Sequence, residues 1–239
     1  MKTKSRLADR RRAGKATPER TRERILAAAR KHFATHGLQL SSIRAITRLA
    51  GVNEALISYH FGSKRKLYEE VLSECVMHVN YPRLAALDEL ERHAKGKPVA
   101  LESLLRVFVS PYVTSGHDPN SHAAIFLRFF GRRFTEPTDD LLEITRSKFA
   151  TMQHRFVVAL ARALPHVPKK DVYLRYSYLI AATAFAAAHT GVLEQYSEGE
   201  YTTREPDFWD HFVRTWCDIM RTPAEAPVAS ATGLLRTTN

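Results

Sequence analysis

The sequence predicts an all-α protein in which an N-terminal three-helix head with a helix-turn-helix is joined by a linker helix to a larger helical body. Three observations predict this class. Apolar residues recur at helical spacing along most of the chain, no β-type alternation interrupts them, and breaks rich in Gly, Pro and Asp separate the helical stretches. The 239 residues are 44% hydrophobic, which is enough for a sizeable core.

The first helix is expected directly after a basic arm. Residues 1–17 are rich in Lys and Arg and poor in apolar residues, so we expect them to be disordered. Thr17 and Pro18 predict the helix start as N-cap and first-turn residue, and Gly37 predicts its end. The inward face is expected to carry Ile25, Ala28, Ala29, His32 and Phe33.

Two short helices and a long one follow in the head. Ser41 or Ser42 caps a helix over 43–50, whose inward residues are expected to be Ile43, Ile46, Leu49 and Ala50. Gly51 provides a tight turn, and Asn53 caps a third helix over 54–61. Gly62 and Ser63 end that helix, and Ser63 caps a linker helix from Lys64 to about Asn80, just before Pro82.

The body continues the helical pattern. Apolar-periodic stretches cover 98–113, 121–134, 138–164, 169–195 and 205–220. The predicted organisation is therefore a basic disordered arm at 1–17, a helix-turn-helix head at 18–63, a larger helical body at 64–221 and a disordered tail at 222–239.

Positive charge is concentrated in the head. Residues 1–70 hold 17 Lys and Arg against 6 Asp and Glu, whereas the remaining residues hold 19 of each. A neutral body with a basic end indicates one surface that faces an anion, and nucleic acid is the commonest such partner.

The geometry of a helix-turn-helix identifies the residues that would face DNA. Val52 and Ile57 are expected to fix the helix over 54–61 to the head's core. That leaves Asn53, Glu54, Ala55, Leu56, Ser58 and Tyr59 to project into a groove about 12 Å wide. The basic arm, Arg44 and Lys64 would lie along the phosphates.

The segments "TRERILAAARKHFATHG" and "SSIRAITRLAGVNEALISYHFGSKRKLYEEVL" resemble the DNA-binding head of the tetracycline-repressor (TetR) family of bacterial transcription regulators. The resemblance covers about 18–72, and "YHFGSK" is its most recognisable part. It implies that Tyr59 and His60 contact DNA, that Phe61 is a core residue and that Lys64 binds a phosphate. It also implies that Ser42 and Arg44 contact a phosphate and a base, and that Asn53, Glu54, Ala55 and Leu56 face the bases.

Two positions depart from the family's common residues. Leu56 stands where many members have threonine, and Ser58 where many have tyrosine. Leucine offers only apolar contact, for example to a thymine methyl group. Glu54 would accept from a cytosine amine, or is simply a solvated acid at a helix start.

The resemblance implies that the body forms a homodimer and holds a small-molecule effector. The helices at about 169–195 and 205–220 suit a dimer interface, because the uncharged, Ala-rich stretch 176–193 allows close packing and Trp209 and Trp216 lie on the second helix. The alternative is internal core. The stretch 176–193 is also long enough to consider as a membrane span, but its Ala, Ser, Thr and His content favours a buried or interface helix.

The stretch 121–141 is the candidate effector pocket. It places aromatic residues beside arginines, which suits a ligand with an apolar body and an anionic end. The candidate ligand-binding residues are Phe126, Phe129, Phe130, Arg133 and Tyr178. Residues 121–185 are similar to the family branch that responds to fatty acids or acyl-CoA thioesters. A plain core stripe of phenylalanines is the competing interpretation.

The predicted function is a ligand-responsive cytoplasmic transcription regulator, most simply a repressor, that binds a palindromic DNA operator as a homodimer. We expect no enzyme activity, cofactor or metal, since the chain has no nucleophile, phosphate-binding or metalloprotease motif and His32 and His36 have no third ligand nearby. Cys75 and Cys217 are widely spaced and predict reduced thiols. The alternatives are a non-specific architectural DNA-binding protein and a drug-efflux regulator that responds to aromatic or cationic compounds.

Overall fold

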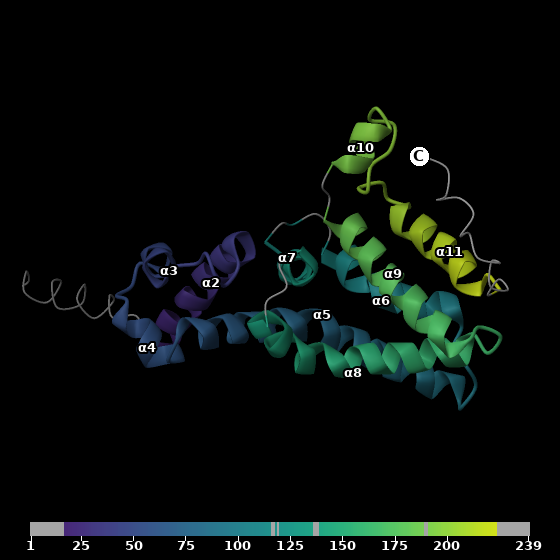
Figure 1. The fold of residues 1–239 in the computed structure, drawn as a ribbon, viewed down its shortest axis with the longest axis horizontal. Coiled ribbons are helices and arrows are strands. Elements are labelled where there is room, and N and C mark those ends of the chain that lie inside the picture. Colours follow the sequence, from purple (N-terminus) through teal and green to yellow (C-terminus); the bar gives the residue numbers. More distant parts are fainter. Residues whose placement is uncertain (1–16, 116–117, 119, 136–138, 189–190, 224–239) are drawn as a thin grey trace, which may run out of the picture. The chain divides into compact units, whose positions relative to one another are not determined.

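The computed structural model describes residues 17–115, 118, 120–135, 139–188 and 191–223, and every regular element within these ranges is a helix. The helices are α2 (Pro18–His36), α3 (Ile43–Ala50), α4 (Ala55–Phe61), α5 (Lys64–Ala94), α6 (Leu101–Ser115), α7 (His122–Thr135), α8 (Asp139–Ala163), α9 (Lys169–Ala187), α10 (Val192–Tyr196) and α11 (Phe208–Arg221) (Figure 1). The side chains of 115, 130, 132–135, 139–142, 144, 145 and 147 are not described. The all-α class is confirmed, while almost all of the predicted arm and tail lie outside the described residues.

Side-chain caps begin the first helices where the sequence predicts them. Thr17 accepts a hydrogen bond from the backbone N–H three residues later at 3.3 Å, and Ser42 does the same at 3.1 Å. Ser41 is therefore not the cap of α3. Its buried hydroxyl instead donates to the Gly37 carbonyl at 2.5 Å, which joins the start of α3 to the end of α2.

The inward face of α3 differs from the prediction at one position. Leu49 was expected inside but is 62% exposed, whereas Thr47 is 2% exposed. Thr47 takes the place because Ile43, Ile46, Thr47 and Ala50 follow the i, i+3, i+4, i+7 spacing of one helix face. The threonine hydroxyl is satisfied there, since it donates to the Ile43 carbonyl at 3.0 Å.

The linker helix is longer than predicted. We expected it to end near Asn80, but α5 passes through Pro82 and ends at Ala94. A proline inside a helix removes one backbone donor and is usually disruptive. Asn80 and Arg83, on either side of the proline, are buried and hydrogen-bonded to each other, and Arg83 also donates to the Phe108 carbonyl of α6 at 2.7 Å. Tertiary packing therefore maintains the helix here.

The single helix predicted over 169–195 is two helices. α9 ends at Ala187, and α10 begins after Gly191. Gly191 has φ 74° and ψ 3°, a left-handed conformation that a right-handed helix does not contain. No helix in the described ranges is long and apolar enough to cross a membrane.

The described helices form two compact units, which we treat separately. The first unit holds the described residues of 1–79 and 118–148, and the second those of 80–117 and 149–239. The predicted boundary at 63/64 followed the Gly-Ser break. The packing instead joins the start of α5 and α7 to the head, because the Tyr68 ring contacts Phe33 and Phe129 at centroid distances of 5.1 and 5.2 Å.

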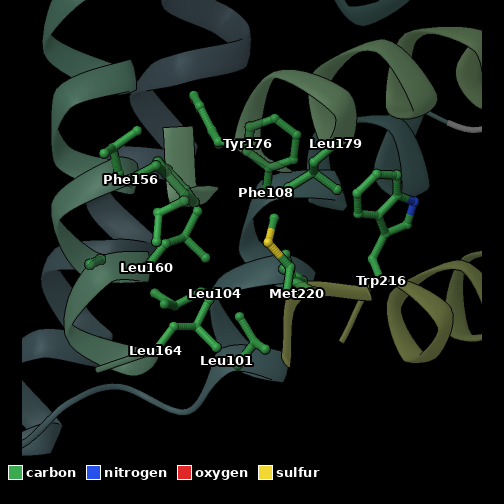
Figure 2. Packing of buried hydrophobic residues seen from close by; sticks show 14 of the residues in the cluster. Leu101, Leu104, Phe108, Phe156, Leu160, Leu164, Tyr176, Leu179, Trp216 and Met220 are labelled. Atoms are coloured by element: carbon green, nitrogen blue, oxygen red, sulfur yellow. The ribbon is translucent and has the colours of Figure 1, made fainter. Parts of the chain in front are cut away.

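The core of the second unit is formed by side chains from α5, α6, α8, α9 and α11. Figure 2 shows residues of these helices converging, among them Leu104, Phe108, Leu160 and Met220. The Phe108 ring meets the Phe156 and Tyr176 rings edge to face, at 5.5 and 5.8 Å between centroids. Phe108 therefore lies at the point where α6, α8 and α9 meet.

Arg24 of α2 joins the first helix to the turn after α3. Its Nη2 donates to the carbonyls of Ala50 at 2.6 Å and Gly51 at 3.1 Å. These lie at the C-terminal end of α3, where carbonyls have no partner within the helix. Gly51 has φ 63° and ψ 43°, and a Cβ added there would lie 2.7 Å from the same Arg24 nitrogen. The turn thus depends on both the glycine and the arginine.

We predict that Arg24→Met lowers the free energy of unfolding by about 1 kcal/mol, because two backbone carbonyls lose their donor. Chemical denaturation followed by circular dichroism measures this change. Arg20→Met, at an exposed position of the same helix, is the matched control and should shift stability by less than about 0.5 kcal/mol. Equal effects of the two substitutions would contradict the role given to Arg24.

Candidate DNA-binding surface

Two apolar side chains fix α4 to the first unit. Ile57 is fully buried and Phe61 is 6% exposed. The Arg22 guanidinium lies over the Phe61 ring, 5.2 Å from its centroid, and also pairs with Glu70. Because Ile57 and Phe61 are one helical turn apart, they determine which side of α4 faces away from the core.

The opposite side of α4 is open to solvent. The exposed residues of this region are Asn53, Glu54, Ala55, Ser58 and Tyr59, and Leu56 and His60 are half-buried. Tyr59 is the most prominent at 76% exposed, and its ring meets the His60 ring edge to face at 4.8 Å. The three consecutive rings of "YHF" are therefore divided, with Tyr59 and His60 outside and Phe61 in the core.

The helix start is capped from the loop. The helix begins at Ala55, and its N-cap position is Glu54, which makes no side-chain capping bond, and not Asn53 as predicted. Asn53 lies one residue before the cap position, and its side-chain oxygen accepts the Ala55 N–H at 2.8 Å. At the other end, Gly62 has φ 79° and Ser63 accepts from the Lys66 N–H at 3.1 Å, so the break and the next cap occur as predicted.

The remaining predicted DNA contacts lie around α3 and the start of α5. Ser42 and Arg44 are exposed. Lys64 is half-buried, and its Nζ donates to the Ser41 carbonyl at 2.9 Å. An ammonium group has three N–H donors, so this bond positions Lys64 and leaves it able to bind a phosphate.

Two arginines were not singled out by the sequence reasoning. Arg48 is exposed one helical turn after Arg44, so the two guanidinium groups belong to the same side of α3. Their i, i+4 spacing was a usable signal. Arg24 gave no such signal, because its role depends on a turn 26 residues away.

The candidate ligand-binding residues fall in both units. Phe126 and Phe129 lie on α7 in the first unit and are 3% and 1% exposed, while Tyr178 lies on α9 in the second unit and is 58% exposed. The side chains of Phe130 and Arg133 are outside the described part of the chain. That these five residues line one pocket stays a prediction.

A groove lies between α8 and α9 in the second unit, with a volume of about 790 Å³. This is within the usual range for small-molecule sites. Its apolar lining includes Val157, Val158, Ala161 and Ile180, and its polar lining includes His154, Arg162, Lys169, Tyr173 and Tyr176.

Tyr176 is buried and borders this groove. Its hydroxyl donates to the Met152 sulfur at 3.6 Å. Burial raises the pKa of the phenol well above its usual value, Tyr112 acts in the same direction and the positive charge of Arg83 opposes both. Tyr176 is therefore neutral at physiological pH and acts as a hydrogen-bond donor. In the part of the chain that is described, no group of three or more His, Cys, Asp or Glu side chains is arranged to hold a metal ion.

Two family models match the chain. The model for "Bacterial regulatory proteins, tetR family" matches residues 25–71, and the model for "Tetracyclin repressor-like, C-terminal domain" matches residues 106–216. The first match contains α3 and α4 entire, and the second extends from α6 into α11.

The curated relatives agree over the head alone. The transcriptional repressor NicS of Pseudomonas putida is 46% identical over 54 residues, which are 23% of this chain and 26% of that protein. The repressor AcnR of Corynebacterium efficiens is 37% identical over 51 residues, 21% of this chain and 27% of that protein. This chain thus matches about a quarter of the length of these relatives.

The fold recurs in a solved structure over most of the chain. The crystal structure of HlyIIR, a hemolysin II transcriptional regulator, has a TM-score of 0.58 and 18% identity, covering 83% of this chain and 98% of that one. At this identity the likeness establishes the fold alone. The two family models together span well over half of the residues, and the chain belongs to the tetR family of bacterial regulatory proteins.

Proposed function

We propose that this chain is a ligand-responsive transcriptional repressor that binds operator DNA as a homodimer through α3 and α4. The observation that carries the proposal is the orientation of α4, in which Ile57 and Phe61 are buried and Tyr59 on the opposite side is 76% exposed. A helix presented in this way fits the major groove of DNA. Two relatives of the head are named as repressors, which supports the direction of regulation.

Base contacts and phosphate contacts would come from different residues, because of the composition of α4. Its sequence, ALISYHF, contains no Lys or Arg. Base contacts would therefore come from Leu56 on a thymine methyl, from Tyr59 and from Asn53 or Glu54 before the helix. Affinity for the phosphates would come from Arg44, Lys64, Arg48 and the basic arm.

Dimerisation through α9 is supported by an apolar stripe that the second unit leaves uncovered. Leu174, Tyr178 and Phe185 are 43%, 58% and 48% exposed. Their spacing, with Ala181 between them, places them along one side of the helix. Ile219 of α11 is also exposed, at 41%. A second copy of the same surface would bury this stripe around a twofold axis.

The effector proposed for the body is a molecule with an apolar portion and an anionic end, such as a fatty acid or an acyl-CoA. The groove between α8 and α9 supports this class, because its lining combines valine, alanine and isoleucine with Arg162 and Lys169. A cationic drug would meet like charges at these two residues, so the lining favours the anionic class.

We predict that Tyr59→Ala and Arg44→Ala each weaken operator binding by about 10- to 100-fold, the effect of losing one good base or phosphate contact. The operator is first selected from a random duplex library with the wild-type protein. Fluorescence anisotropy at near-physiological salt then measures each variant on the selected duplex and on its scrambled version.

Tyr201→Ala is the matched control, because this tyrosine is 61% exposed and lies outside the head. It should bind as the wild type does. A specific regulator is expected to prefer the selected duplex by about 10³-fold or more. Equal affinity for the scrambled duplex would leave only architectural DNA binding, and normal binding by Tyr59→Ala would exclude α4 as the recognition helix.

We predict that replacing the seven Lys and Arg of residues 1–15 by Gln reduces the salt dependence of operator binding. Each lost phosphate contact should lower the log–log slope by about 0.9. Titrations between low and moderate salt measure the slope. An unchanged slope would mean that the arm makes no phosphate contact.

We predict that Tyr178→Arg raises the dimer dissociation constant by at least about 10-fold. In a twofold interface each subunit would bring its added positive charge into the apolar contact. Native mass spectrometry and light scattering over a concentration series measure this constant. Tyr201→Arg introduces the same charge away from the stripe and should leave the dimer intact. If Tyr178→Arg remains dimeric at the wild-type constant, the stripe is not the interface.

A further inference from the structure

Arg83 of α5 is a buried cation. Arg83 is 1% exposed, and its side chain is the largest among the fully buried residues of the described chain. No Asp or Glu within the described residues forms an ion pair with it. An uncompensated buried charge costs several kcal/mol, so proteins seldom keep one without a use for it.

The fold uses only part of the Arg83 guanidinium. Its Nε donates to the Phe108 carbonyl at 2.7 Å, and Nη1 donates to the Asn80 side-chain oxygen at 3.2 Å. Among the residues that the structure describes, no acceptor is bonded to the buried Nη2 or to the buried Asn80 amide nitrogen, Nδ2. Arg83 Nη2 and Asn80 Nδ2, on the same side of α5, therefore both carry N–H donors that have no acceptor among the described residues.

A third donor lies near the same place. The Phe108 ring contacts the Arg83 guanidinium at 4.5 Å and the Tyr176 ring at 5.8 Å. The Tyr176 hydroxyl donates only to the Met152 thioether, which is a weak acceptor. The centre of the second unit therefore has an excess of donors and a positive charge, and it lacks an acceptor with a negative charge.

A purely structural role explains one of these bonds. Pro111 of α6 leaves the Val107 carbonyl without its backbone donor, and the Ser110 hydroxyl donates to that carbonyl at 3.0 Å. The Arg83 bond to the Phe108 carbonyl instead joins α5 to α6. A single donor would satisfy this carbonyl. The Phe108 and Tyr112 rings also contact the guanidinium, at 4.5 and 5.1 Å, and stabilise part of its charge. Neither role accounts for the unpaired nitrogens of Arg83 and Asn80.

We propose that Arg83, Asn80 and Tyr176 bind the carboxylate of an amphipathic effector, whose apolar portion occupies the groove between α8 and α9. The proposal rests on the proposed function and names the group that the effector must carry. Tyr176 connects the two parts, since it lines the groove and contacts Phe108 beneath Arg83. A carboxylate supplies two strong acceptors and one negative charge, which are what the cluster lacks.

The first test places the missing carboxylate inside the protein. Asn80→Asp keeps the shape of the side chain and turns it into an acid beside Arg83, while Asn80→Leu removes the amide without adding charge. We expect Asn80→Asp to melt at a higher temperature than both the wild type and Asn80→Leu. We also expect it to lose binding of carboxylate ligands, because its own carboxylate occupies the anion site.

The second test uses straight-chain carboxylates from butanoate to dodecanoate, each against the alcohol of the same length. Binding is followed by tryptophan fluorescence, because Trp209 stacks on Tyr112 at 6.2 Å and Tyr112 lies against Arg83. The wild type should prefer a carboxylate to its alcohol by at least about 10-fold. Arg83→Met should lose this preference, and Arg175→Met, which removes a different bond to a backbone carbonyl, should keep it.

The outcomes separate this proposal from the proposed function. If the wild type binds no carboxylate better than its alcohol, or if Asn80→Asp binds them as the wild type does, the carboxylate site is wrong. Neither result would contradict the proposed DNA-binding function, because operator selection with the same protein tests that function separately. If Arg83→Met fails to fold, the comparison of Asn80→Asp with Asn80→Leu decides the question.

Discussion

The burial of Ile57 and Phe61 is the constraint from which the proposed recognition surface follows. α4 has seven residues, so two large apolar side chains one turn apart are enough to fix its rotation about its own axis. A rotation that buried Tyr59 would remove a phenol from water without a known partner and expose both apolar side chains. The burial of Ile57 and Phe61 in the core of the head therefore determines which side of α4 is available to a partner.

Charge has different roles in the two units. Residues 1–70 carry the whole excess of cations, and such an excess attracts a polyanion at long range. Residues 71–239 hold 19 Lys and Arg and 19 Asp and Glu, so a count of charges gives no reason to expect an anion in this part of the chain. Its one informative cation, Arg83, is buried, and what matters at that position is the lack of a neighbouring acid and not the net charge of the domain.

Much of the head could be predicted because its signals are local. The caps at Thr17, Ser42 and Ser63 each accept from an N–H group three residues later, and helical spacing identifies Ile57 as buried. One miss was also local, because Thr47 and not Leu49 follows the helical spacing of Ile46 and Ala50, and its hydroxyl donates to a carbonyl four residues earlier. The length of α5 depended on a distant partner, because Arg83 donates to the Phe108 carbonyl of α6. The division of the body's helices depended on Gly191, whose left-handed conformation is not visible in an apolar pattern.

The position of Arg83 in the chain connects the proposed effector site to the helix that begins in the head. α5 starts at Lys64, which is bonded to the Ser41 carbonyl, and the same helix carries Asn80 and Arg83 around its only proline. Pro82 removes one backbone hydrogen bond from this segment, and the Arg83 bond to the Phe108 carbonyl joins the same segment to α6. A carboxylate bound by Asn80 and Arg83 as proposed would therefore add its contacts to a part of α5 that tertiary packing already supports.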